Sequence, residues 1–294
     1  MMVPVLMYHH ISPLTGPHTV TPELFRDHLK TLSDKGIRTL SLDEFAAWRR
    51  GELAIQQPAV LLTFDDAWLD NWAYALPVLE EFSAQGVFFV VTSWPGAGAA
   101  RVGLGSDPDW RPFSHAESMK LAGTDSGDNV SMRWSELLAA RDTGLVSLAS
   151  HSHGHGDWWK RGTGVNELLE YFETDLRQTA DVLEAKLGAC PPHLCWPKGH
   201  FCNSMMKIAE DNGFIHQYST LRGSNQKKAT TQIRRINVEN RPGEWLWRRL
   251  TIYGNQLTAS ALGVVHQNLH YERMKTRYPN LPRKEFVGPR LHLI

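Results

Sequence analysis

The sequence has no excess of charge, because 31 Lys and Arg residues balance 31 Asp and Glu residues among its 294 positions. A protein that binds nucleic acid generally needs a basic surface, so this balance argues against that class. Cysteine is scarce as well. The three cysteines, at positions 190, 195 and 202, form no C-x-x-C pair. An odd number within one short stretch does not indicate a disulfide framework.

Long hydrophobic runs are also absent. No stretch of about 18 consecutive apolar residues occurs, so the sequence predicts no transmembrane segment. The first residues lack the basic start and the long apolar run of a secretory signal. From these two absences we expect a cytoplasmic protein.

Histidine and tryptophan, in contrast, are plentiful, with 14 His and 11 Trp residues. Histidine is the commonest metal ligand and can carry a proton near neutral pH. Tryptophan offers a flat apolar face that packs in cores and stacks on sugar rings. With 42% hydrophobic and 21% charged residues, the composition is otherwise typical of a globular protein, which excludes disordered, collagen-like and coiled-coil classes.

The zero net charge conceals an uneven distribution. Residues 241–294 hold nine Lys and Arg against three Asp and Glu, a net charge of +6, and residues 1–240 hold 22 against 28, a net charge of −6. We therefore expect a main domain over 1–240 and a basic C-terminal extension over 241–294. Such an extension can be solvated, can dock on its own acidic domain, or can contact anionic lipid or a phosphate-bearing glycan at a membrane surface.

Short apolar runs alternate with amphipathic segments through the main domain. The runs predict strands over residues 3–8, 37–40, 59–64, 87–92, 145–149, 194–196 and 216–220. The periodic segments predict helices over residues 21–35, 41–51, 67–83, 133–143, 165–187 and 204–212. This alternation indicates βαβ units and a parallel sheet or barrel. Residues 94–130 break the rhythm, and we interpret them as an insertion over one face, a candidate lid.

Two polar clusters directly follow predicted strands, where working residues gather in parallel α/β folds. In Thr63-Phe64-Asp65-Asp66, the carboxylates could cap the next helix, or one could bind a cation while the other faces a water. In His151-Ser152-His153-Gly154-His155, a tight turn could aim two imidazoles inward. Imidazoles and a carboxylate suit a divalent transition metal, whereas a His-rich surface patch is the alternative interpretation.

Taken together, the clusters resemble the polysaccharide deacetylase family (carbohydrate esterase family four, the NodB-like domain). Residues 63–66 match its T-F-D-D motif, and residues 151–155 match its H-[S/T]-x-x-H motif. The opening Leu6-Met7-Tyr8-His9-His10-Ile11 resembles the permuted branch, which includes poly-N-acetylglucosamine deacetylases. The resemblance covers roughly residues 3–240. It implies a distorted (β/α) barrel of about seven parallel strands.

The resemblance also implies a metal-dependent N-deacetylase. Asp66, His151 and His155 would hold one divalent transition metal, with zinc the default and cobalt, nickel or iron the alternatives. Asp65 would act as the general base on a water. His9 would act as the general acid that protonates the leaving amine.

The adjacent His10 is the alternative for the acid, and it is also a candidate substrate contact. A third cluster, Trp196-Pro197-Lys198-Gly199, stands where the permuted branch commonly has Y-P-Y-G. Its backbone would support the oxyanion, with Trp196 as a groove wall. Lys198 would contact an acidic substrate group or the Asp65 side of the site. Trp158 and Trp159, beside the metal ligands, are candidates for sugar stacking, with core packing equally open.

The chain departs from the family pattern at two points. Ala67 follows the Asp pair where the family usually has Gly, a replacement that is conservative in size. The family's D-x-x-D-W motif is missing. Arg234 or Arg235, before Ile236, could match the family's late R-I-x-V strand and orient the base, but the sequence does not decide between them.

We therefore expect a hydrolase that removes N-acetyl groups from an N-acetylhexosamine-containing glycan or a cell-envelope glycan intermediate. A nucleotide-linked or lipid-linked sugar would be such an intermediate. Hydrolysis of another linear or cyclic amide at the same metal site is one alternative. A non-catalytic glycan-binding relic of the fold is the other, which the intact base and ligands disfavour.

Overall fold

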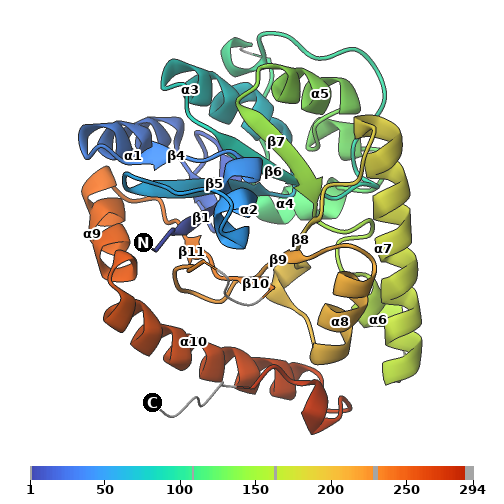
Figure 1. The fold of residues 1–294 in the computed structure, drawn as a ribbon. Helices are drawn as coiled ribbons and strands as arrows, with labels where there is room; N and C mark the ends of the chain where they lie inside the picture. Colours follow the sequence, from blue (N-terminus) through green and yellow to red (C-terminus); the bar gives the residue numbers. More distant parts are fainter. Residues whose placement is uncertain (1, 108, 162–163, 228–230, 289–294) are drawn as a thin grey trace.

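The computed structural model describes residues 2–107, 109–161, 164–227 and 231–288. Within them, nine strands form one curled sheet in which every pairing is parallel. The order is β10-β9-β8-β7-β6-β5-β1-β11, with β4 paired to β5 off this path. Helices surround the sheet (Figure 1), which confirms the predicted distorted (β/α) barrel.

The strands and helices follow the predicted alternation closely. The strands are β1 (Val5–Tyr8), β2 (His10–Ile11), β3 (Thr19–Val20), β4 (Arg38–Thr39), β5 (Ala59–Asp65), β6 (Gly86–Val90), β7 (Val146–Ser150), β8 (His193–Cys195), β9 (His216–Tyr218), β10 (Gln232–Ile233) and β11 (Ile236–Asn237). The α-helices are α1 (Pro22–Asp34), α2 (Leu42–Arg50), α3 (Leu76–Glu81), α4 (His115–Leu121), α5 (Trp134–Asp142), α6 (Trp158–Arg161), α7 (Val165–Leu187), α8 (Asn203–Asp211), α9 (Gly243–Gly254) and α10 (Gln256–Arg277). Short turns of other helix types are η1 (Asn71–Ala75), η2 (Leu104–Ser106), η3 (Gly127–Asn129), η4 (Pro197–Gly199) and η5 (Arg283–Glu285).

Helix starts are encoded locally. The Thr21 side chain accepts a hydrogen bond from the Leu24 amide, and Pro22 occupies the first turn of α1. Ser41 and Glu44 form a reciprocal capping box at the start of α2. These are the two starts that the sequence predicts most directly.

Alternation along the strands separates two buried layers. One set of strand side chains points into the barrel, with Val5, Leu61 and Phe89 among its members. The intervening residues point outward to the covering helices, as Leu62 and Phe88 do. Both faces of the strands are therefore buried, which explains why the sequence shows continuous apolar runs instead of a hydrophobic–polar alternation.

The two edges of the sheet are neighbours in the sequence. Only Arg234 and Arg235 separate β10 from β11, although these strands lie at opposite ends of the strand order. The sheet must therefore curl until its edges nearly meet. The Arg235 guanidinium is fully buried inside the barrel, and the Arg234 guanidinium donates hydrogen bonds to the Gly263 carbonyl and the Gln267 side chain of α10.

In the described part of residues 241–294, two helices pack against the barrel. Figure 1 shows α9 beside α1, with α10 continuing past β10. The α9 amide at Gly243 donates to the Asp27 carboxylate, and the His28 ring bonds the Arg241 carbonyl. These contacts place α9 and α10 directly on the barrel. The division at residue 240 stays a prediction.

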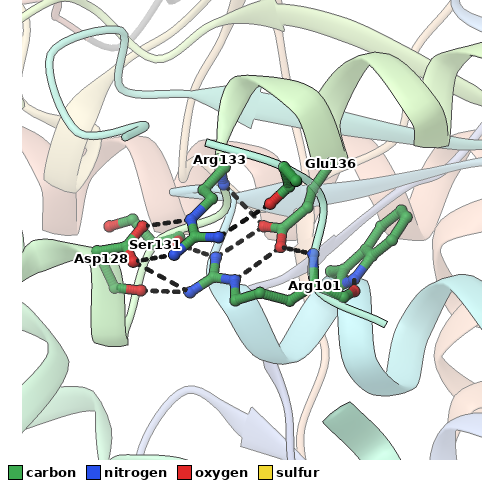
Figure 2. A network of polar contacts seen from close by, with 7 residues as sticks. Arg101, Asp128, Ser131, Arg133 and Glu136 are labelled. Atoms are coloured by element: carbon green, nitrogen blue, oxygen red, sulfur yellow. Dashed lines mark hydrogen bonds and ion pairs between the residues drawn. The ribbon is translucent and has the colours of Figure 1, made fainter. Parts of the chain in front are cut away.

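Residues 94–130, expected to be an insertion, are tied to α5 by a polar network (Figure 2). The Arg101 guanidinium donates to both oxygens of the fully buried Glu136 carboxylate, at 2.7 Å each. It also reaches the Ser131 carbonyl at 3.0 Å, while Arg133 pairs with Asp128. Because buried charges need such complete pairing, the network holds this segment and its helix α4 in a defined position.

We predict that Gly243→Ala destabilises the chain. A Cβ at this position would lie 2.0 Å from Thr31 Oγ1 and 2.7 Å from the Asp27 carbonyl, so α9 would have to move off α1. The expected loss is about 1–3 kcal/mol in urea unfolding. Gly254→Ala, in the same helix and with open space around its Cβ, is the control and should be neutral or stabilising. Equal losses for both variants would show that the close packing of α9 on α1 is unimportant.

Candidate active site

A cavity of about 580 Å³ opens at the carboxyl ends of the strands, a size typical of small-ligand pockets. Loops from β1, β5, β7, β8 and β9 contribute to its walls. The lining includes all five residues expected to carry the chemistry, namely His9, Asp65, Asp66, His151 and His155.

Strand alternation explains which side chains reach this cavity. Met7 and His9 lie on the inward face that Val5 begins, and both line the cavity. In β5, Asp65 has the same inward parity as Leu61. The alternation of inward and outward side chains in β1 and β5 therefore extends to His9 and Asp65.

Asp66 turns out of the strand direction and faces the two imidazoles. Its backbone has φ +76°, and its Oδ1 lies 3.3 Å from His151 Nε2 and 3.1 Å from His155 Nε2. Asp66 Oδ1 is buried, yet it has no hydrogen bond with correct geometry. A buried anionic oxygen without a donor is costly, so these three atoms suit a shared cation better than one another.

The tautomer of His151 supports this interpretation. His151 Nδ1 lies 2.9 Å from the Cys195 carbonyl, which can only accept, so Nδ1 carries the hydrogen. When His151 is neutral, its lone pair is therefore on Nε2, on the side of Asp66. Burial opposes ionisation of Asp66, but protonated His155 and His151 rings outweigh it and hold the pKa of Asp66 well below its usual range. Cys195 and Asp66 in turn hold the pKa of His151 well above its usual range despite its burial, and a bound metal would take the place of the proton on Nε2. One carboxylate and two imidazoles with room beside them fit a divalent transition metal.

Asp175, on α7, holds the loop that carries the two histidines. Its carboxylate accepts hydrogen bonds from the His153 amide at 2.8 Å and the Gly154 amide at 2.6 Å. Burial raises the pKa of Asp175 to about 6. Asp175 is not among the site residues predicted from the sequence. The available signal was a carboxylate on the buried stripe of α7, between Leu168 and Leu183.

The second carboxylate, Asp65, pairs with Arg235. The guanidinium donates to both carboxylate oxygens, at 2.5 and 2.8 Å, and both residues are buried. Burial would raise the pKa of Asp65, but Arg235 more than offsets this and keeps it lowered. Of the two arginines left open by the sequence, Arg235 contacts Asp65 and Arg234 binds α10. A second possible ligand set, Asp65 with His151 and Cys195, exists but would have to compete with Arg235.

The neighbouring histidines His9 and His10 occupy different environments. His9 lines the cavity, and its Nε2 lies 3.8 Å from Asp65 Oδ2, longer than a hydrogen bond. Burial lowers the pKa of His9 to about 3 against the raising effect of the carboxylates. His10 points to the other side, where its ring is buried between Asp70 Oδ2 at 2.6 Å and His115 Nδ1 at 3.2 Å.

His10 is 1% exposed and does not line the cavity, so its position does not support the expected substrate contact. Instead, it connects Asp70 to His115, which does line the cavity. His115 is the first residue of α4, so residues 94–130 contribute directly to the site. No pattern in the sequence indicates this long-range pairing.

The tryptophans expected near the substrate lie away from the cavity. Trp196 is 1% exposed and packs on Phe201, and Trp158 is 2% exposed and lies in the same apolar cluster. Trp159 stacks on Tyr278 with ring centroids 4.1 Å apart. The burial of Trp158 corresponds to the core-packing alternative, and Trp196 is buried as well. Trp159 is partly buried and does not line the cavity.

In the third motif, only Lys198 lines the cavity. Pro197 is buried, and Gly199 has φ +67° with Thr220 Oγ1 2.0 Å from where a Cβ would stand. Glycine is therefore required there for a turn that presents Lys198.

Unusual backbone conformations concentrate around the cavity. Among the described residues, seven that are not glycine have positive φ, and six of these line the cavity or adjoin a metal-ligand candidate: His18, Asp66, Ala67, Ser152, His155 and Lys198. Such conformations cost about 1–3 kcal/mol each and cluster at functional sites. The change to Ala67 is thus conservative in size but adds strain, since its φ is +52°.

We predict that Arg235→Met lowers the free energy of unfolding by about 3–5 kcal/mol, because it leaves Asp65 buried without its cation. Adding Asp65→Asn should restore part of the loss, since neither charge then remains. Chemical unfolding of the wild type, both single variants and the double variant measures this coupling. Strictly additive losses would contradict a direct interaction between the two side chains.

The family model described as polysaccharide deacetylase matches residues 54–215. The poly-beta-1,6-N-acetyl-D-glucosamine N-deacetylase of Escherichia coli (strain K12) is 21% identical over 246 residues, covering 76% of this chain and 34% of that protein. The chain spans about a third of the length of the curated relatives it matches.

Solved structures show the same fold. IcaB from Ammonifex degensii aligns with a TM-score of 0.67 at 20% identity, over 84% of this chain and 95% of that one. The de-N-acetylase from Aggregatibacter actinomycetemcomitans aligns with a TM-score of 0.68 at 19% identity, over 85% of this chain and all of that one. The resemblance drawn from the motifs is confirmed by these matches.

Proposed function

The chain belongs to the polysaccharide deacetylase family, and on that premise we propose that it is a metal-dependent N-deacetylase of an N-acetylhexosamine-containing glycan or glycan intermediate. The main observation behind the proposal is that two adjacent buried carboxylates have different partners. Asp66 faces two imidazoles, whereas Asp65 faces an arginine and the open cavity.

Asp66, His151 and His155 would hold the metal. When bound, the ion supplies a Lewis acid that polarises the amide carbonyl and makes a water more acidic. His151 presents its Nε2 lone pair because the Cys195 carbonyl fixes the hydrogen on Nδ1. Asp175 keeps the loop that bears both histidines in place through two backbone amides.

Asp65 would accept the proton of the attacking water. Arg235 keeps Asp65 ionised and fixes its plane through two hydrogen bonds, so the carboxylate is ready to act as a base. Attack of the water on the amide carbon and cleavage of the C–N bond release acetate and a free amine.

His9 would deliver a proton to that amine. Burial lowers the pKa of His9 and keeps its ring neutral, so it must first acquire a proton. Asp65, 3.8 Å from His9 Nε2, is the nearest acidic group to supply the proton taken from the water. Base and acid thus lie side by side at the floor of the cavity.

No helix among the described residues has the length and apolar character to span a membrane. The Escherichia coli relative named above deacetylates poly-beta-1,6-N-acetyl-D-glucosamine by its name, and we infer the same class of amide bond for this chain.

The proposal predicts separate effects on metal content and on catalysis. Purified wild type and Asp65→Asn should each bind about one transition metal per chain, since Asp65 is not needed as a ligand. Acetate release from N-acetylated glycans should fall by about 10²–10⁴-fold in Asp65→Asn. Elemental analysis and an acetate assay measure the two quantities.

Asp211→Asn, which removes an exposed carboxylate paired with Lys207, is the matched control and should change neither quantity. A wild-type chain that binds no metal after reconstitution would refute the proposed mechanism. Unchanged acetate release in Asp65→Asn would refute the role of Asp65 alone.

A further inference from the structure

One face of α10 forms a wall of the cavity. His266, Leu269, His270 and Arg273 all line it, at the i, i+3, i+4 and i+7 spacing of a single helix face. Arg234, between the edge strands β10 and β11, donates hydrogen bonds to Gly263 and Gln267. These bonds hold α10 beside the cavity. The basic extension therefore belongs to the site, in addition to the barrel itself.

The lining is unevenly charged. Its basic residues beyond the histidines are Lys198, Arg222 and Arg273, and its acidic residues are Asp65 and Asp66. Asp65 is already neutralised by Arg235, which does not line the cavity. Asp66 would be neutralised by the bound metal. Three positive charges thus face the cavity with no carboxylate of the lining left to balance them.

The distinguishing feature of these cations is that they gather around one cavity. Some exposed basic side chains pair with a neighbour, as Lys30 does with Asp34 and as Lys275 of α10 does with Glu272. Within the described ranges, Lys198, Arg222 and Arg273 have no ion-pair partner. Unpaired cations gathered around a pocket raise the local concentration of anions and can bind an oxyanion directly.

We propose that the cavity takes N-acetylated sugars that carry an oxyanion, a phosphate or a carboxylate, held by Lys198, Arg222 and Arg273. The inference rests on the proposed deacetylase function for the acetamide end of the substrate. Lys198 lies close enough to Asp66 and His155 to interact with them electrostatically, so it would meet an anionic group near the acetamide. Arg273 and Arg222 lie on α10 and on the loop after β9, toward the outer wall.

The three cations predict that the cavity prefers anionic to neutral N-acetylated sugars. Assays with neutral polymers of N-acetylglucosamine would not detect this preference. An arginine can hold two oxygens of a phosphate or carboxylate at once, which adds geometric selectivity to attraction. Because the site is partly exposed, the preference should weaken as salt concentration rises.

Equilibrium binding tests the proposal without requiring turnover. Three probes carry the same acetamido sugar: neutral N-acetylglucosamine, N-acetylglucosamine 1-phosphate and N-acetylmuramic acid, which bears a carboxylate. Calorimetry on the metal-loaded chain should show at least one anionic probe binding about tenfold more tightly than the neutral one. The probe with the stronger preference identifies whether phosphate or carboxylate is the natural group.

Arg273→Ala should remove most of this preference while binding of the neutral probe changes less than about threefold. Lys275→Ala, on the outer face of the same helix, is the matched control and should keep the preference. Both variants carry the same metal, so a loss confined to Arg273→Ala reports the arginine and not metal chelation by the oxyanion.

Equal binding of the three probes, or an unchanged preference in Arg273→Ala, Arg222→Ala and Lys198→Ala, would overturn the inference. Neither result would affect the proposed deacetylation, which is judged by metal content and acetate release. Conversely, a preference for anionic probes in a chain that releases no acetate would leave this inference standing and refute the catalytic proposal.

Discussion

Two adjacent carboxylates at the end of a buried strand are the constraint on which the site depends. Both Asp65 and Asp66 are almost completely buried, and two like charges so close together cannot share one environment. The chain separates them by turning the backbone to φ +76° at Asp66. One carboxylate continues the inward face of β5 and meets a guanidinium, while the other leaves that face and meets two imidazoles. The strain of this turn is balanced by both sets of partners.

Closure of the sheet provides the first set of partners. Its two edge strands, β10 and β11, are joined by only two residues, so Arg235 is brought into the barrel opposite β5. The preceding Arg234 faces outward and binds α10. Consecutive residues at one seam therefore fix the carboxylate at the centre of the cavity and the helix at its wall. The two consecutive arginines thus connect the basic extension, through α10, with Asp65 in the cavity.

Much of this arrangement could be predicted from sequence, because local patterns encode it. Apolar runs and helix caps predicted the alternating strands and helices. The two motif clusters, through the family they resemble, predicted the barrel and the grouping of Asp65, Asp66, His151 and His155. Strand parity from Val5 would also have favoured His9 over His10 for the cavity. An arginine beside the base was expected, but the choice between Arg234 and Arg235 stayed open. The contacts of Asp175 and His115 could not be predicted, since each joins residues far apart in the chain. Trp158 and Trp196 lie in the core, a placement that nearness in sequence to a ligand or motif does not reveal.

The most direct test is the position of the metal itself. Crystals grown with zinc, measured at its absorption edge, locate the ion independently of any assay. The account predicts a single site within bonding distance of Asp66, His151 and His155, with Asp65 still hydrogen-bonded to Arg235. An ion bound instead by Asp65 and the Cys195 thiol, with Arg235 displaced, would contradict the assignment of Asp66 as the metal ligand and Asp65 as the base.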